Sequence, residues 1–220
     1  MIATVTRRTQ HKTVARFFAP RPMTFDEWLE TGSETRDNPT ELINGTPVPQ
    51  PMVQLEHEKL NLWLLVVLVQ YARRAGIGTV LGTRSPVQIN NYQGRLPDLF
   101  FVRKENEGFL TSKATRIAPD LCMELVSPND RRADITATEA DYRSLGVREI
   151  VYIDQQRRKV RVLRRRGDTG DDYDEETLSS GDPLILQTMN AVSLAWNWVF
   201  VEPRPDEIDT VLSLLQTDSV

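Results

Sequence analysis

The stretch that decides the fold is apolar and carries one acid in its middle: Leu121-Cys122-Met123-Glu124-Leu125-Val126. A short run of this kind, without polar alternation, is typical of a β-strand that is covered on both faces. A second run with the same character, Asp98-Leu99-Phe100-Phe101-Val102, lies earlier in the chain and opens with an acid. The two runs predict neighbouring core strands that carry Asp98 and Glu124.

Further elements extend this core in both directions. Residues 150–154 and 159–163 predict two more strands joined by a turn. Pro128 and Gly146 bound a predicted helix, which forms the crossover between the strands at 121–126 and 150–154. Residues 55–75 predict a long buried helix that ends at Gly76. The sequence therefore predicts an α/β fold with a mixed central sheet flanked by helices.

Local signals also mark the two ends of this core. Thr24 is expected to cap a short helix through Glu30, and Asn44-Gly45 predicts a tight hairpin at 41–48. A short amphipathic helix is expected near 206–215. We therefore expect three regions, which are a basic, flexible tail at 1–22, one folded domain at 23–203, and a C-terminal helix and tail at 204–220.

The composition limits what the chain can do. Lys plus Arg number 27 and Asp plus Glu number 31, and the resulting formal net charge of −4 excludes a strongly cationic binder of nucleic acid. The single cysteine, Cys122, cannot form an internal disulfide, so we expect a reducing, cytoplasmic location. The longest uncharged apolar run, 60–72, is shorter than the roughly 20 residues of a membrane span, so no membrane partner is expected.

Asp98 and Glu124 are the residues that point to chemistry. Acids are rarely buried unless they are paired, accept hydrogen bonds or bind a metal. Taken singly, Asp98 fits a turn cap at a strand end and Glu124 fits a salt bridge. Taken together on neighbouring strands, they fit a shared hard cation such as Mg²⁺ equally well, with a main-chain carbonyl such as that of Leu125 as a third ligand. His11 and His57 are the only histidines, which excludes a histidine-rich metal site.

An ordered set of motifs resembles a known family. Pro97-Asp98 is followed by Glu124-Leu125-Val126-Ser127-Pro128, an arrangement similar to that of the bacterial putative restriction endonuclease family (Uma-type) of the PD-(D/E)XK nuclease superfamily. The resemblance covers about 24–200 and includes Glu41-Leu42-Ile43-Asn44-Gly45, His57, Ala118-Pro119-Asp120-Leu121, Tyr142, Gly146-Val147, Glu149 and Asp154.

The resemblance implies a restriction-endonuclease-like fold and Mg²⁺-dependent hydrolysis of DNA, with Mn²⁺ as an alternative ion. By position, Asp98 and Glu124 match the metal-binding acids, and Glu41 matches a further acid of the catalytic site. His57 matches a position at the helix start, where we expect helix capping or phosphate contact. The resemblance also implies DNA as partner and a homodimer. The sequence has no Gly-rich phosphate-binding loop, and no small-molecule cofactor is expected.

One position departs from the family pattern. The resembling family usually carries a lysine four residues before its tyrosine, and counting back from Tyr142 gives Thr138. Residues four apart lie on one face of a helix, so position 138 is expected to face the sheet at the catalytic site. Threonine cannot supply the charge of lysine. Arg131 or Arg132 would offer a substitute cation that stabilises phosphate, although arginine is a poor base because it stays protonated.

Three functions therefore stay open. The leading hypothesis is a Mg²⁺-dependent DNA endonuclease. The second is a cleavage-incompetent relative that binds nucleic acid or a protein partner as a dimer, and Thr138 favours it. The third is a structural module in which Asp98 and Glu124 form salt bridges.

Two conspicuous features are interpreted as structural. Seven basic residues at 157–166 are followed by six acids at 168–176, which indicates a hairpin held by salt bridges more than a track for phosphates. Trp196 and Trp198 could stack on bases, but packing in the core or at a dimer interface is favoured.

Overall fold

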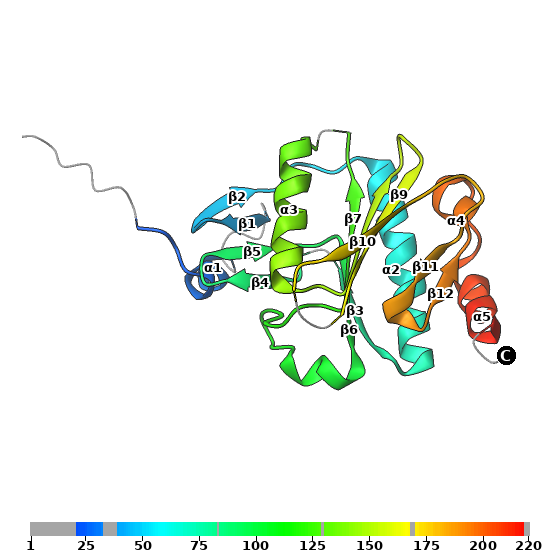
Figure 1. Ribbon diagram of the computed structural model, residues 1–220, viewed down its shortest axis with the longest axis horizontal. Helices are drawn as coiled ribbons and strands as arrows, with labels where there is room; N and C mark the ends of the chain where they lie inside the picture. The colour runs from blue at the N-terminus through cyan, green and yellow to red at the C-terminus, as the bar shows by residue number, and fades with distance from the viewer. Residues whose placement is uncertain (1–20, 33–38, 83, 129, 168–169, 218–220) are drawn as a thin grey trace, which may run out of the picture.

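A computed structural model describes residues 21–32, 39–82, 84–128, 130–167 and 170–217 (Figure 1). The basic tail expected at 1–22 lies almost entirely outside the described residues. Two β-sheets and the helices that flank them form most of the described chain. No described helix is long and apolar enough to cross a membrane.

The larger sheet has six strands in the order β10-β9-β8-β7-β6-β3. Strands β7 and β8 are parallel, whereas the other pairs are antiparallel, so the sheet is mixed as expected. The strands are β3 (Gly78–Gly82), β6 (Leu99–Arg103), β7 (Leu121–Val126), β8 (Glu149–Asp154), β9 (Lys159–Arg165) and β10 (Tyr173–Leu178).

Two helices cover the two faces of this sheet (Figure 1). Helix α2 (Leu55–Ala75) packs on the face that carries Leu121, Met123 and Leu125. Helix α3 (Arg132–Leu145) is the crossover between β7 and β8, and its Tyr142 packs on the opposite face with Cys122. Because strand residues alternate between faces, every second residue of β7 meets α2 and the others, including Glu124, face α3.

The smaller sheet packs beside the larger one and has the strand order β2-β1-β5-β4. Its strands are β1 (Thr40–Ile43), β2 (Thr46–Pro49), β4 (Val87–Asn90) and β5 (Gln93–Arg95). The predicted hairpin joins β1 and β2, and Asn44 and Gly45 both have positive φ, as a tight two-residue turn requires.

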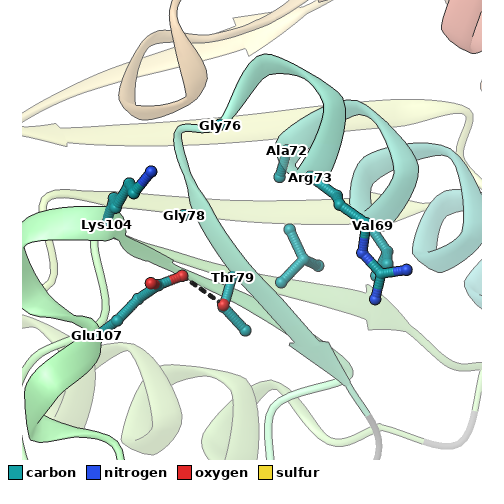
Figure 2. Close-up of a pocket in the computed structure, with 9 residues that line it drawn as sticks. Val69, Ala72, Arg73, Gly76, Gly78, Thr79, Lys104 and Glu107 are labelled. Carbon is teal, nitrogen blue, oxygen red and sulfur yellow. Dashed lines mark hydrogen bonds between the residues drawn. The ribbon is translucent and has the colours of Figure 1, made fainter.

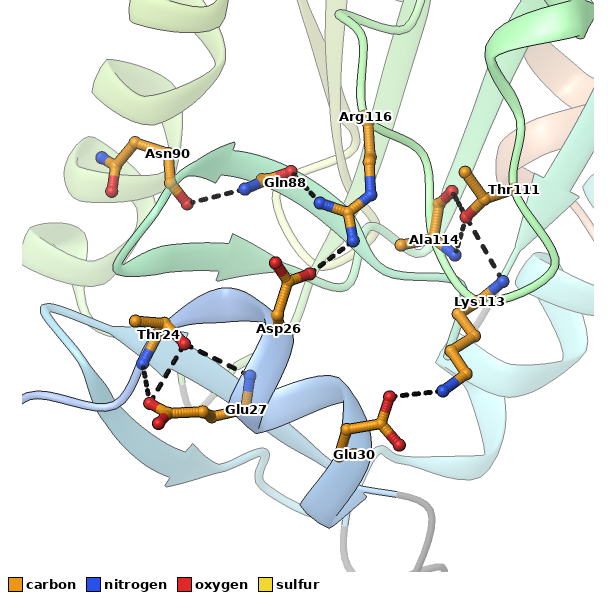
Figure 3. Close-up of polar contacts among 10 residues, drawn as sticks. All are labelled: Thr24, Asp26, Glu27, Glu30, Gln88, Asn90, Thr111, Lys113, Ala114 and Arg116. Carbon is orange, nitrogen blue, oxygen red and sulfur yellow. Dashed lines mark hydrogen bonds and ion pairs between the residues drawn. The ribbon is translucent and has the colours of Figure 1, made fainter.

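Helix α1 (Phe25–Gly32) begins with a reciprocal cap between Thr24 and Glu27. The Glu27 carboxylate accepts from the Thr24 N–H at 2.9 Å, and the Glu27 N–H donates to the Thr24 hydroxyl at 3.3 Å (Figure 3). Ion pairs of Asp26 with Arg116 and of Glu30 with Lys113, each 2.5 Å long, tie the helix to the loop that precedes β7 (Figure 3).

The C-terminal part of the chain packs on the α2 side of the large sheet. It contains β11 (Leu184–Leu186), a 3₁₀ turn at Gln187–Met189, β12 (Val192–Leu194), α4 (Trp196–Phe200) and α5 (Glu207–Thr217). Another 3₁₀ turn, Lys104–Phe109, follows β6 earlier in the chain. Val211 and Leu214 of α5 belong to the same buried cluster as α2, and the Trp63 indole donates to the Pro205 carbonyl at 2.9 Å. Helix α5 is therefore part of the main core.

Candidate active site

Asp98 and Glu124 face each other where the pairing of β6 with β7 ends. The last pairs of that antiparallel ladder are Phe100 with Cys122 and Leu99 with Met123, so one further step places Asp98 opposite Glu124. The Leu125 N–H donates to Oδ2 of Asp98 at 2.8 Å. The aspartate side chain thus takes the place of a strand partner and fixes itself beside the glutamate.

A residue of helix α3 fixes the side chain of Glu124 through a hydrogen bond. The hydroxyl of Tyr142, a fully buried residue, donates a short hydrogen bond to Oε1 of Glu124. Burial, followed by the negative charge of Asp98, raises the pKa of Glu124 well above its ordinary value. No ion pair of Glu124 occurs within the described part of the chain, so the salt-bridge interpretation does not account for this acid.

His57 lies in the first turn of α2 and points at Asp98. Its Nε2 is 3.3 Å from Oδ2 of Asp98, and its side chain is buried. Burial lowers the pKa of His57, but the hydrogen bond and charge of Asp98 outweigh burial and raise that pKa above its ordinary value. Gln54 is the N-cap residue of α2 and makes no side-chain cap. The capping role expected for His57 is therefore wrong, because its Nε2 contacts Asp98 and Gln54 holds the cap position. The expected contact with phosphate stays a prediction.

Glu41 lies close enough to Glu124 for its charge to contribute to the raised pKa of Glu124. Both carboxylate oxygens of Glu41 are engaged: Oε1 accepts from the Leu96 N–H at 3.0 Å and Oε2 pairs with Arg95 at 2.8 Å. Arg95 also pairs with Asp141 of α3 at 2.6 Å. Glu41 therefore positions the chain around the site through Arg95.

Arg95, the ion-pair partner of Glu41, is a residue of this region that the sequence analysis did not single out. It is almost completely buried and bridges the small sheet to α3 through Glu41 and Asp141. Its only sequence signal is its place three residues before Asp98. Arg131 and Arg132, the expected substitute cations, are both exposed, and Arg131 pairs with Asp134 at 2.8 Å.

Thr138 lies on α3 one turn before Tyr142 and is half-buried. Because Tyr142 reaches Glu124 from this face of the helix, position 138 lies on the side of α3 that meets the sheet. The threonine side chain at this position is shorter than that of the expected lysine and carries no charge. The described residues thus bring Asp98, Glu124 and Glu41 together and place Thr138 on the helix above them.

The donor set of the pair fits a hard divalent cation. The contacts of Asp98 with the Leu125 N–H and with His57 fall on Oδ2, which leaves Oδ1 outside them, and Glu124 accepts from the Tyr142 hydroxyl on Oε1 and from the main chain of Asp98. Two close carboxylates with mutual repulsion gain from a shared positive charge. Among the described residues, no group of three or more His, Cys, Asp and Glu side chains could hold a metal, so further ligands would be carbonyl groups or water.

The Arg-rich segment forms part of a salt-bridged hairpin. In the pairing of β9 with β10, Arg161 lies 3.3 Å from Glu175 and Arg164 lies 2.8 Å from Glu176. These arginines are used within the fold, which favours the structural interpretation of the segment. Trp196 is buried and packs on Phe200 with ring centroids 4.3 Å apart, so core packing accounts for it better than base stacking.

A cavity of about 290 Å³ lies away from these acids, between the end of α2, the start of β3 and the 3₁₀ turn that follows β6 (Figure 2). Its walls include Arg73, Thr79, Lys104 and Glu107, and the Thr79 hydroxyl donates to Glu107 at 2.5 Å (Figure 2). None of the residues that the sequence predicts for the site lines this cavity.

The sequence and the fold were both compared with those of known proteins. Curated proteins give no significant match to the sequence. A crystal structure of a putative nuclease belonging to DUF820 from Anabaena variabilis ATCC 29413 superposes with a TM-score of 0.65 and 17% identity, over 88% of this chain and 99% of that chain. The sequence profile of the Uma2 family, described as putative restriction endonucleases, matches residues 23–197. The chain therefore belongs to the Uma2 putative restriction endonuclease family.

Proposed function

We propose that this protein is a Mg²⁺-dependent DNA endonuclease in which Asp98 and Glu124 bind the metal, with Mn²⁺ as a substitute. The observation that carries the proposal is the meeting of these two acids at the end of the β6–β7 ladder, where the Leu125 N–H fixes Asp98. Membership of a family of putative restriction endonucleases supports nucleic acid as the substrate.

When bound, Mg²⁺ would activate water and offset the charge that builds on the phosphate. The residues of the chain do the positioning. His57 and the Leu125 N–H hold Asp98, and the Tyr142 hydroxyl holds Glu124. Glu41 pairs with Arg95 within the small sheet, and Arg95 ties that sheet to α3 through Asp141.

Cleavage of supercoiled and linear DNA in Mg²⁺ or Mn²⁺ tests the proposal. The wild type is expected to nick the plasmid, whereas Asp98→Asn and Glu124→Gln lose the activity. Asp182→Asn serves as the matched control, because this exposed acid only accepts from the Ser179 N–H in a turn. A wild type without activity, or activity that survives both site substitutions, would overturn the proposal.

A second candidate follows from Thr138. A short, uncharged residue on the sheet side of α3 favours a cleavage-incompetent relative that binds nucleic acid or a protein partner as a dimer. This candidate predicts Mn²⁺ binding without turnover and a gain of cleavage in Thr138→Lys. Metal-dependent turnover by the wild type removes it.

We also infer a homodimer, for which an exposed apolar stripe on the first half of α2 is the support. Leu55, Leu62 and Val66 of α2 are exposed, as is Met52 just before the helix, and Met52 and Leu62 are 93% and 60% exposed. Exposed apolar side chains spaced along one helix are typical of an interface. Sedimentation should give a dimer for the wild type and a monomer for Leu62→Glu, and a monomeric wild type contradicts the inference.

The single cysteine, buried Cys122, supports a cytoplasmic location.

A further inference from the structure

Tyr152 carries a buried hydroxyl next to the proposed metal site. It lies on β8 and pairs in parallel register with Glu124 of β7, so both side chains leave the sheet toward α3. Tyr152 is 4% exposed, and its hydroxyl has no hydrogen-bond partner among the described groups. Buried hydroxyls normally have a partner, and such an exception at a site suggests that the group serves a ligand or water.

The ring of Tyr152 is held in one place. The Arg161 guanidinium lies over it, 4.9 Å from the ring centroid, and Arg161 is itself fixed by ion pairs with Glu139 of α3 and Glu175 of β10. Strand β9 and helix α3 thereby fix the position of the hydroxyl. Burial, followed by the charge of Glu124, raises the pKa of Tyr152, so the hydroxyl stays protonated and can both donate and accept a hydrogen bond.

Neither Tyr142 nor Thr138, two α3 residues on this side of the sheet, forms a hydrogen bond with the Tyr152 hydroxyl. The Tyr142 hydroxyl is already used by Oε1 of Glu124. Thr138 lies one turn earlier on the same helix and carries a short side chain. The result is a buried hydroxyl without a protein partner among the described residues, on the strand next to Glu124 and on the sheet face that α3 covers.

We propose that the Tyr152 hydroxyl binds and orients the water molecule that attacks the phosphate, which makes Tyr152 a catalytic residue of this site. The inference rests on the proposed function. In the hydrolysis, the water oxygen bonds to phosphorus while the bond from phosphorus to the leaving sugar oxygen breaks. The water gives a proton to solvent, the leaving oxygen takes one from solvent, and Tyr152 keeps its own.

Tyr152→Phe tests the proposal because it removes the hydroxyl and keeps the ring under Arg161. The rate of plasmid cleavage is expected to fall about 100-fold, the loss typical of one oriented hydrogen bond at a reacting group, while KM for DNA and the calorimetric Kd for Mg²⁺ stay unchanged. Tyr173→Phe is the matched control, since Tyr173 also lies under an arginine but its hydroxyl donates to the Val147 carbonyl. That control is expected to lower Tm and leave the cleavage rate unchanged.

Two readouts without turnover accompany the assay. A high-resolution crystal structure of the metal-free wild type should show an ordered water on the Tyr152 oxygen, and Tyr152→Phe should lack it with Tm unchanged or lowered. A dry hydroxyl, with Tm raised in Tyr152→Phe, overturns the proposal. If the wild type cleaves and Tyr152→Phe cleaves equally fast, the inference fails while the proposed function stands. If the wild type does not cleave, both fail.

Discussion

Replacing Glu124 by glutamine is expected to stabilise the metal-free protein and to abolish its stabilisation by Mg²⁺. Burial and the charge of Asp98 raise the pKa of Glu124 in the folded state. The folded protein therefore binds this proton more tightly than the unfolded chain, and stability is lost as the pH rises through the interval between the two pKa values. Glutamine removes the charge and keeps an oxygen for the Tyr142 hydroxyl.

The size of both effects can be estimated. Each unit by which the folded pKa exceeds the unfolded one costs about 1.4 kcal/mol once the pH lies above both values. In a protein of this size, about 1 kcal/mol corresponds to roughly 2–4 °C in Tm. A ligand at about 100 times its Kd adds about 2.7 kcal/mol of stability, or roughly 5–10 °C.

Thermal melts with and without Mg²⁺ at neutral pH measure both effects. The wild type should melt at a higher temperature in Mg²⁺, whereas Glu124→Gln should melt above the wild type without metal and not respond to metal. Glu105→Gln is the control, because Glu105 is an exposed acid outside the site. A lowered Tm in metal-free Glu124→Gln, or a wild-type response to Mg²⁺ in that variant, would refute the reasoning.

Three further predictions concern the same region and the sheet behind it. Arg95→Gln leaves the part-buried carboxylates of Glu41 and Asp141 without their cation. It should lower the free energy of unfolding, measured by urea titration, by about 3–5 kcal/mol. A loss under about 1 kcal/mol, as for surface ion pairs, contradicts this. Arg164→Met should cost about 3 kcal/mol, since Glu149 is 1% exposed and pairs with Arg164 at 3.0 Å; an unchanged urea midpoint argues against it. Mg²⁺ affinity should fall as the pH falls, because the metal competes with a proton for Glu124, whose pKa is raised. A calorimetric Kd for Mg²⁺ that does not rise as the pH is lowered rejects this.

Much of the fold follows from local sequence signals. Helix α2 ends at Ala75, where Gly76 adopts a positive φ of 68°, and β7 has the bounds that its apolar run predicts. Such boundaries depend on residues that are neighbours in the chain. The proximity of Asp98 and Glu124 could also be predicted in outline. Burying an unpaired charge is costly, so two acids in apolar strands of one sheet are expected to share a site.

Contacts between distant parts of the chain could not be predicted in this way. Arg95 bonds to residues 54 and 46 positions away, and nothing near it in the sequence marks it as buried. His57 stands where a helix cap is common, yet its partner is Asp98 on another element. Tyr152 is one residue of a largely apolar strand, and only the assembled sheet and α3 show that its buried hydroxyl has no protein partner among the described residues.

The proposed metal site is tested by the position of Mn²⁺ in crystals soaked with that ion, located by anomalous scattering. We expect one strong peak about 2.0–2.2 Å from a carboxylate oxygen of Asp98 and from one of Glu124, and no such peak in Asp98→Asn. A wild-type crystal with no peak between these two acids, at a Mn²⁺ concentration that supports cleavage, would contradict this expectation.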